Sequence, residues 1–556
     1  MPGTGKTTIS RTFASACRDR TPLVAPDHRL PDTFFLGASF FFDRTKPDRN
    51  EASRVFTTIS RTLADVLPDI RDHICETIAK NPNIGNENLS RQWNHLVFQP
   101  LLAWERQQDL LPVVLIFVLD AMDECQNERD LRLIFQLMSQ VQQFERIRVR
   151  VFITSRPEVH VRLGILEGLH DIVQEELLDK VSTADTGNDD ITLYMEHELA
   201  KIRKKHSATD WPPQEEVSTL VEKADGLFIY AATACRFLGG ARSRSQLDTR
   251  LGMIFDSRVA GTSPQGSLDE IYTHILQFSV TGQDILEEEK QDLADLFRQV
   301  VGSIISLFEP LGVAALSGLL AMPPSIIEET LQDLHSLLAV PADDQTPVKL
   351  LHLSFRDFLL DSQRCLDPSF LIDEDRQHET LLSHCLEVMS SRLRQNICSL
   401  GQPGELMSEI EPSLVTQSIP VHFYYACAYW IDHLRASKAQ LEDGGEVHEF
   451  LKTHFLHWLE VLALLGKSSD AVRKIQELWD YLLFSDVSLS STNVTFTRLT
   501  RILRAPCSPN SASWYMTRHG FPLLLEPSLK PHHFRRIARP LFSRPRRALL
   551  GTCLRV

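Results

Sequence analysis

The sequence lacks the features that define several large protein classes. Its ten cysteines stand singly among 556 residues, without a CxxC pair, which argues against a disulfide framework and against a zinc site. The longest apolar stretch, near residues 300–322, is interrupted by Glu309 and Pro310, so no membrane span is expected. No basic patch followed by an apolar run opens the chain, so no signal peptide is expected. Together these absences predict a cytoplasmic protein with reduced thiols.

Excess positive charge is also lacking over most of the chain. The formal net charge is −15, which argues against nucleic acid and anionic lipid as partners. Residues 501–556 are the exception, because they carry ten arginines, one lysine and seven prolines against the single acid Glu526. Two interpretations of this tail stay open: a nucleic-acid-binding arm, and a misread intron or shifted frame. The second is favoured because the tail shows no periodicity of apolar residues.

The remaining pattern predicts an α/β region followed by helices. Short apolar runs at residues 34–42, 113–120 and 149–154 are separated by helical stretches, which is typical of a parallel sheet with crossover helices. From about residue 185 helical patterns dominate, apart from a β-hairpin expected at 338–351, which suggests a winged-helix-like arrangement. The predicted domains are an α/β domain at 1–180, a helical domain at 185–265, a winged-helix-like domain at 266–365, a helical domain at 370–485 and an irregular tail at 486–556.

Two of the helical patterns are specific enough to state separately. Residues 326–337 are predicted as one helix, because Ser325 and Glu328 have the spacing of a capping box. The stripe of Phe423, Cys427, Trp430 and Leu434 predicts the buried face of an amphipathic helix rather than part of a metal site.

Two enzyme classes, the serine hydrolases and the protein kinases, are disfavoured, because neither the sequence G-x-S-x-G nor the sequence H-R-D occurs.

The first residues match the end of a phosphate-binding loop. Gly3, Gly5, Lys6, Thr7 and Thr8 fit the last positions of G-x-x-x-x-G-K-[ST], followed by a helical stretch. Glycines let backbone N–H groups surround phosphate oxygens, the lysine reaches the β/γ-phosphates, and the hydroxyl of Thr7 would bind Mg²⁺. The motif's opening glycine and its preceding strand would lie before Met1. We therefore expect an internal start or a truncated gene model in which the first strand of the sheet is missing.

A second motif follows about 115 residues later. The apolar run at residues 113–120 ends in Asp120, which is the arrangement of a Walker B strand whose carboxylate lies near Mg²⁺. Asp123 and Glu124 follow and could position or activate the attacking water. The alternative is a buried strand followed by a helix cap.

A third motif places an arginine after the next apolar run. Thr154, Ser155 and Arg156 follow residues 151–153 and would bring a guanidinium to the edge of the sheet where a γ-phosphate lies. Taken alone, the segment is also compatible with an ordinary helix cap.

These motifs, in this order, resemble the NACHT family of signal-transducing NTPases, and more narrowly the fungal NACHT and nephrocystin-like proteins. The segments 37–42, 224–231, 352–359 and 425–430 add to the resemblance, which covers about residues 1–480. It implies that Gly5, Lys6 and Thr7 bind phosphate and Mg²⁺, that Asp120 is the metal aspartate, that Asp123 and Glu124 are the hydrolytic acids and that Arg156 is the sensor. His352 is the candidate for a winged-helix histidine that touches the β-phosphate of bound ADP; the alternative is a histidine hydrogen-bonded inside the fold.

The function implied by the resemblance is a nucleotide-dependent switch of the NOD-like receptor type. ATP or GTP with Mg²⁺ would bind in the α/β domain, and slow hydrolysis would control self-association or engagement of an effector protein in fungal non-self recognition or incompatibility. The alternative is a truncated, non-enzymatic helical scaffold that no longer binds nucleotide. A small-molecule P-loop kinase is disfavoured, because the roughly 300 mostly helical residues that follow the α/β region do not resemble an acceptor-binding lid.

Overall fold

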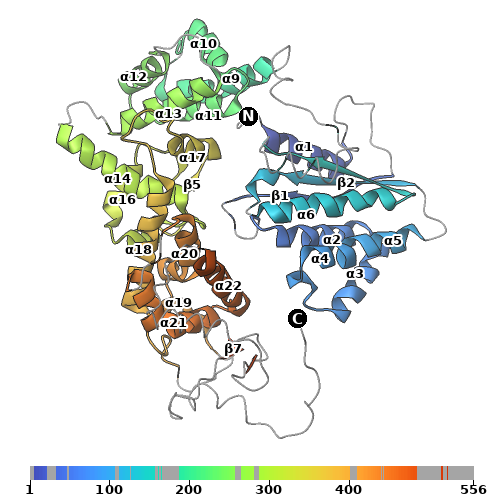
Figure 1. Ribbon diagram of the computed structural model, residues 1–556. Coiled ribbons are helices and arrows are strands. Elements are labelled where there is room, and N and C mark those ends of the chain that lie inside the picture. The colour runs from blue at the N-terminus through green and yellow to red at the C-terminus, as the bar shows by residue number, and fades with distance from the viewer. Residues whose placement is uncertain are drawn as a thin grey trace, which may run out of the picture.

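A computed structural model shows the chain as an α/β part, coloured blue in Figure 1, beside a long helical part coloured green to red. The residues that the structure describes are 5–21, 33–44, 46, 49–106, 112–125, 127–156, 161, 165, 174, 187–208, 210–256, 264–280, 287–400, 410–439, 441, 444–484, 515–516 and 522–523.

The sheet of the α/β part consists of three parallel strands. β1 (Phe34–Phe41) and β3 (Ile147–Ile153) flank β2 (Val113–Asp120), in the order β1-β2-β3. β2 is almost continuously buried, as expected for a central strand covered on both faces. The three strands fall on the three predicted apolar runs, so the sequence prediction of a small parallel sheet is confirmed.

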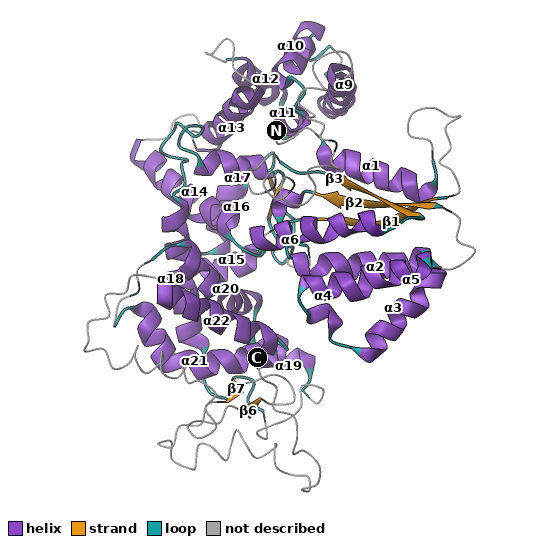
Figure 2. Cartoon of the chain, turned by 45° about the vertical axis from the view of Figure 1, so that its right-hand side comes forward, coloured by secondary structure: helices purple, strands orange, loops and turns teal. Residues whose placement is uncertain are grey.

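Helices cover both faces of this sheet, with α1 (Lys6–Asp19) on one side and α2 (Val55–Val66) and α6 (Glu128–Met138) on the other (Figure 2). Ala14 and Cys17 of α1 pack on Ile116 and Val118 of β2. The opposite layer is larger and also includes α3 (Pro68–Lys80), α4 (Leu89–Trp93) and α5 (Gln99–Glu105).

A glycine allows β1 and β2 to approach closely. The pairing register of β1 shifts between Leu36 and Ala38, around Gly37. A Cβ atom at Gly37 would lie 2.6 Å from a ring carbon of Phe117, a distance that real side chains do not reach. Gly37 therefore keeps the central strand in place, and with it the acidic residues at the end of that strand.

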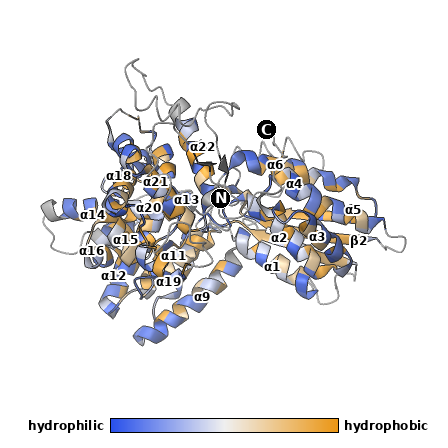
Figure 3. Cartoon of the chain, turned by 90° about the horizontal axis from the view of Figure 1, so that it is seen from below, coloured by the Kyte–Doolittle hydropathy of each residue, from blue (hydrophilic) through white to orange (hydrophobic). Residues whose placement is uncertain are grey.

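The helical part has one continuous hydrophobic core that runs from Ile191 to Leu478. Seen from below, the helical and α/β parts lie beside each other, and hydrophilic segments mark the outer turns of their helices (Figure 3). The elements, in chain order, are α9 (Gly187–His206), α10 (Gln214–Ala224), α11 (Phe228–Gly239), α12 (Arg244–Phe255), α13 (Pro264–Val280), α14 (Glu287–Ser306), α15 (Val313–Leu320), α16 (Pro324–Leu331), β4 (Leu338–Ala339), β5 (Lys349–Leu350), α17 (Leu353–Leu360), α18 (Glu374–Arg392), α19 (Pro412–Ser418), α20 (Val421–Ala436), α21 (Glu446–Leu464) and α22 (Ser468–Phe484).

The predicted hairpin is present, but the helix before it ends earlier than predicted. β4 and β5 pair antiparallel, as the pattern at residues 338–351 indicates. The helix α16 begins at Pro324 and ends at Leu331, six residues earlier than expected, and Ser325 lies inside it rather than at its cap. Turn bonds from Leu334 N to Leu331 O (3.1 Å) and from Leu337 N to Leu334 O (2.8 Å) replace the last helical turns.

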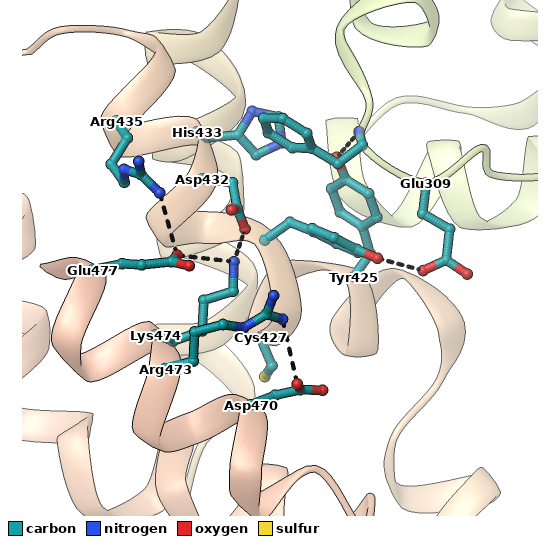
Figure 4. Close-up of polar contacts among 12 residues, drawn as sticks. Glu309, Tyr425, Cys427, Asp432, His433, Arg435, Asp470, Arg473, Lys474 and Glu477 are labelled. Carbon is teal, nitrogen blue, oxygen red and sulfur yellow. Dashed lines mark hydrogen bonds and ion pairs between the residues drawn. The ribbon is translucent and has the colours of Figure 1, made fainter. Parts of the chain in front are cut away.

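Partly buried polar contacts hold the C-terminal helices together (Figure 4). The ammonium group of Lys474 on α22 pairs with Asp432 on α20 and lies 3.5 Å from Glu477. Phe308 N donates to the hydroxyl of Tyr425 at 3.1 Å, which ties the segment after α14 to α20. The predicted stripe on α20 is buried throughout. In the tail, the described residues form two short antiparallel strands, β6 (Tyr515–Met516) and β7 (Pro522–Leu523).

Candidate functional site

The first predicted motif forms the start of α1. Gly5 has φ +81°, a left-handed conformation that glycine adopts without strain, and its carbonyl accepts from Ile9 N at 3.0 Å. Lys6 is the half-buried first residue of the helix, and Thr7 is exposed in the same turn. Gly3, also predicted to bind the nucleotide, lies outside the described residues. The backbone N–H groups at this helix start provide the partial positive charge that favours a phosphate.

Asp120 lies where α1, β2 and β3 meet. Its side chain is 1% exposed, and its Oδ1 accepts from Thr154 Oγ1 at 2.5 Å. Ser10, one turn after Lys6, places its hydroxyl 2.7 Å from the same oxygen and 3.0 Å from the Lys6 carbonyl. The N-terminal turns of α1 and the end of β2 are thus brought together, as the motifs predict. Within the described part of α1, Ser10 hydrogen-bonds to Asp120 whereas Thr7 and Thr8 do not, and the binding of Mg²⁺ by Thr7 stays a prediction.

Arg156 lies between carboxylates of the two parts of the molecule. Its Nε is 3.3 Å from Asp123 Oδ2, and its backbone N–H donates to Asp123 Oδ1 at 2.9 Å. Its Nη1 is 2.5 Å from Asp357 Oδ2 on α17, 201 residues further along the chain. The guanidinium predicted to sense a γ-phosphate therefore joins the sheet edge to α17.

Glu124 lies at the same edge, and the pKa of its carboxyl is strongly raised. Burial raises the pKa of its carboxyl to about 7, with Asp123 and Asp43 adding to the rise, while the bond from Arg44 N (3.0 Å) and the charge of Arg156 oppose it. A cavity of about 50 Å³ opens beside it, lined by Arg44, Asp123, Glu124, Arg156, Leu353 and Asp357. That space is large enough for a water molecule next to a carboxyl that titrates near neutrality.

His352 forms the N-cap of α17. Its Nδ1 accepts from Ser354 N at 3.1 Å and lies 2.6 Å from Ser354 Oγ. Burial lowers its pKa to about 4, helped by Arg156 and Lys6 and opposed by Asp357, so the ring is neutral at pH 7. A role in touching phosphate stays a prediction. The hydrogen-bonded position matches the alternative of a histidine held within the fold.

Sequence reasoning missed three residues of this cluster. Ser10 and Thr154 converge on Asp120, and Asp357 pairs with Arg156. Thr154 belongs to the third motif, Asp357 lies in the segment 352–359 and Ser10 follows Lys6 by one helical turn, so their positions in the sequence offered a reason to consider each of them. The ion pair between Arg156 and Asp357 could not be predicted, because no local pattern encodes a contact across 201 residues.

The oxygen groups here fit a magnesium-bound nucleotide better than a metal held by protein alone. Mg²⁺ is usually bound by one or two carboxylates together with phosphate oxygens and water. Within the part of the chain that the structure describes, no group of three or more histidine, cysteine, aspartate or glutamate side chains converges as a metal site. Asp120, with the hydroxyls around it, supplies the single hard-oxygen anchor that such a site needs. Among the same residues, no helix is long and apolar enough to cross a lipid bilayer.

Known proteins are similar to this chain both over its α/β part and over most of its length. Residues 1–156 match the family described as Nephrocystin 3, N-terminal. Over 515 residues, 86% of this chain, the sequence is 24% identical to the vegetative incompatibility protein HET-E-1 of Podospora anserina. The chain spans 34% of the length of that relative. These findings confirm the resemblance to fungal nephrocystin- and NACHT-like proteins.

Proposed function

We propose that the chain is a nucleotide-dependent signalling switch of the NOD-like receptor type, which binds ATP or GTP with Mg²⁺ and hydrolyses it slowly. The observation that carries the proposal is the convergence of the start of α1, Asp120 and the Asp123–Arg156 pair at one edge of a parallel sheet. Ligands of open α/β sheets bind at this carboxyl edge. The similarity to a vegetative incompatibility protein supports a role in fungal non-self recognition or incompatibility.

In this proposal, different residues of the chain bind phosphate, orient the metal and activate water. The backbone of Gly5 and the side chain of Lys6 hold phosphate oxygens, and Thr7 with Asp120 orients the metal. Bound Mg²⁺ supplies positive charge that offsets the charge of the phosphates. Glu124, with a pKa of about 7, accepts the proton of a water in the adjacent cavity at neutral pH.

Arg156 is the link between the nucleotide and the helical part. Its guanidinium is shared between Asp123 and Asp357, and a third anion at the sheet edge competes for it. Separation of Arg156 from Asp357 frees α17 from the sheet. In the proposed organisation, α17 closes a winged-helix-like domain at residues 266–365, between helical domains at 185–265 and 370–485. Its release would expose surfaces for self-association or an effector.

The proposal is tested by measuring the affinity of the chain for a nucleotide. Titration with a fluorescent ATP or GTP analogue and Mg²⁺ should show saturable binding that falls about 100-fold or more in Lys6→Ala, because the ammonium group that binds phosphate is removed. Lys80→Ala is the matched control, since Lys80 is exposed on α3 and pairs with Glu76 at 2.7 Å. Equal affinity of the Lys6→Ala chain and the unaltered chain would contradict the proposal.

A second candidate is a helical scaffold that binds no nucleotide. The small size of the sheet-edge cavity, about 50 Å³, and the neutralisation of Arg156 by two carboxylates favour it. The same titration separates the two functions, because a scaffold would not bind the analogue at any concentration, with or without Mg²⁺.

A further inference from the structure

A second cavity in the described part of the molecule lies away from the sheet edge. It holds about 690 Å³ and opens between α9, α11, α12 and the turns that follow α16. A volume of this size lies within the range of about 300–1,000 Å³ typical of small-molecule sites, which occur preferentially between structural units. None of the residues assigned to the nucleotide lines it.

The walls of the cavity are strongly basic. Five cationic side chains line it against two carboxylates, so its net charge is +3 when histidine is neutral; the cations are Lys201, Lys205, Arg236, Arg242 and Arg250, and the acids are Glu198 and Asp333. This excess stands out in a chain whose formal net charge is −15. Charge of one sign focused in a concave site attracts the opposite charge.

Several of these charged side chains already form ion pairs or hydrogen bonds within the protein. Lys201 pairs with Glu198 at 2.6 Å, and Arg250 lies 4.0 Å from Asp333. Lys205 donates to the carbonyl of Gly239 at 2.7 Å, at the end of α11. A carbonyl satisfies a donor without neutralising its charge, so this ammonium still attracts an anion.

Four groups on the walls have no partner among the described residues. The guanidinium groups of Arg236 and Arg242 make no hydrogen bond or ion pair there, and both residues are exposed. Arg250 Nε and Ser336 Oγ also lack a partner, although their residues are only 5% and 6% exposed. These two atoms are closed to solvent, so the exposed guanidinium groups of Arg236 and Arg242 are the groups without a partner that a ligand in the cavity can reach.

We propose that this cavity binds a small molecule that carries two phosphate groups. Arginine presents a planar set of donors that fits phosphate oxygens, and three arginines surround one space. Two phosphate monoesters carry about three to four negative charges at neutral pH, which balances the net charge of +3. Burial raises the pKa of Cys235, which also lines the cavity, to about 12, so its thiol is neutral and takes no part.

The bound molecule would contact two units of the helical part at once. Arg236 and Arg242 belong to the α9–α12 region, and Ser336 lies in the turn between α16 and β4. A ligand that contacts both stabilises their present arrangement, and the free energy of unfolding rises with its concentration.

Inorganic pyrophosphate is the probe for this site. Calorimetric titration of the full chain carrying Lys6→Ala, without Mg²⁺ and at constant ionic strength, removes the contribution of the phosphate-binding loop. We expect saturable binding in that background. Adding Arg236→Gln and Arg242→Gln should weaken it about 100-fold, roughly tenfold for each guanidinium removed. Both arginines are exposed and unpaired within the described residues, so the variants should fold, which circular dichroism checks.

Two further variants sharpen the result. Arg244→Gln removes the same charge from the same region, but Arg244 pairs with Asp248 at 3.1 Å and does not line the cavity, so the affinity should not change. Asp333→Asn removes a negative charge from the wall and should tighten binding severalfold. Absence of all binding in Lys6→Ala, or equal affinity in the double arginine variant, would overturn the proposal and leave the assignment of the nucleotide site intact.

Discussion

Polar side chains gather at the carboxyl edge of the sheet and again between α18 and α20, and the two clusters are held in different ways. At the sheet edge, Arg156 and Asp357 form an ion pair and keep 20% and 31% of their side chains exposed. Between the helices, His378, His433 and Tyr425 are 5%, 0% and 0% exposed. The open cluster can exchange partners with a ligand or water, whereas the closed one can only be satisfied internally.

The closed cluster is a continuous chain of hydrogen bonds. Phe308 N donates to the hydroxyl of Tyr425, which lies 2.9 Å from His433 Nε2. On the other side of the same ring, His433 Nδ1 lies 2.8 Å from His378 Nδ1, so one neutral imidazole donates to the other. Burial lowers the pKa of both histidines, which keeps the rings neutral. We infer from this difference that the closed cluster between α18 and α20 contributes to stability, whereas the charged side chains at the sheet edge are available to bind a ligand.

The largest effect is expected from His433→Ala. It removes the hydrogen-bond partner that the hydroxyl of Tyr425 and Nδ1 of His378 share, and it opens a cavity, so the free energy of unfolding should fall by about 3–5 kcal/mol. Urea denaturation followed by circular dichroism measures the decrease. His73→Ala, at an exposed position on α3, is the control and should cost less than about 0.5 kcal/mol. A similarly small decrease for His433→Ala would mean that the closed cluster contributes little to stability.

The next effect is at the sheet edge and separates stability from function. Asp357→Ala should lower the free energy of unfolding by only about 1 kcal/mol, because Arg156 keeps its contact with Asp123 and both groups are partly exposed. The same variant should bind nucleotide more tightly, since one of the two carboxylates that compete with phosphate for Arg156 is removed. Urea denaturation and fluorescent-nucleotide titration measure the two changes.

Asp292→Ala, at an exposed position on α14, is the control for removal of a negative charge. If Asp357→Ala instead destabilised the chain as much as His433→Ala, the sheet edge would have to be regarded as a structural cluster like the other one.

The sequence predicted the open cluster better than the closed one, for a physical reason. Asp120 ends one apolar strand and Arg156 follows the next, and parallel strands bring their carboxyl ends to one edge, so local patterns were enough to predict that both lie at this edge. The stripe on α20 predicted that Cys427 and Trp430 would be buried. Nothing local joins His433 to His378 or Arg156 to Asp357, since these contacts depend on how helices distant in sequence pack.

The predicted helix at residues 326–337 illustrates the same limit. Its apolar period continued past Leu331, but Leu334 and Leu337 are buried in turns rather than in a helix. Tertiary packing ended the helix where periodicity alone would extend it. The capping-box spacing of Ser325 and Glu328 was likewise overridden, because the helix begins at Pro324, two residues before the predicted start at residue 326.

The smallest expected effect concerns Glu124 and depends on pH. Its pKa is about 7 in the folded chain against an ordinary value of 4.5, so between these values the folded state retains a proton that the unfolded state has released. Stability therefore falls as pH rises through this window, and ionised Glu124 is a cost above it. Glu124→Gln should raise the free energy of unfolding at pH 8 by about 1 kcal/mol, with the gain vanishing near pH 4.5. Urea denaturation at both values measures it, with Glu379→Gln on α18 as the control for removal of a negative charge. A gain independent of pH would show that the carboxyl does not titrate in the open cluster, and the contrast with the neutral, closed histidine pair would lose its electrostatic basis.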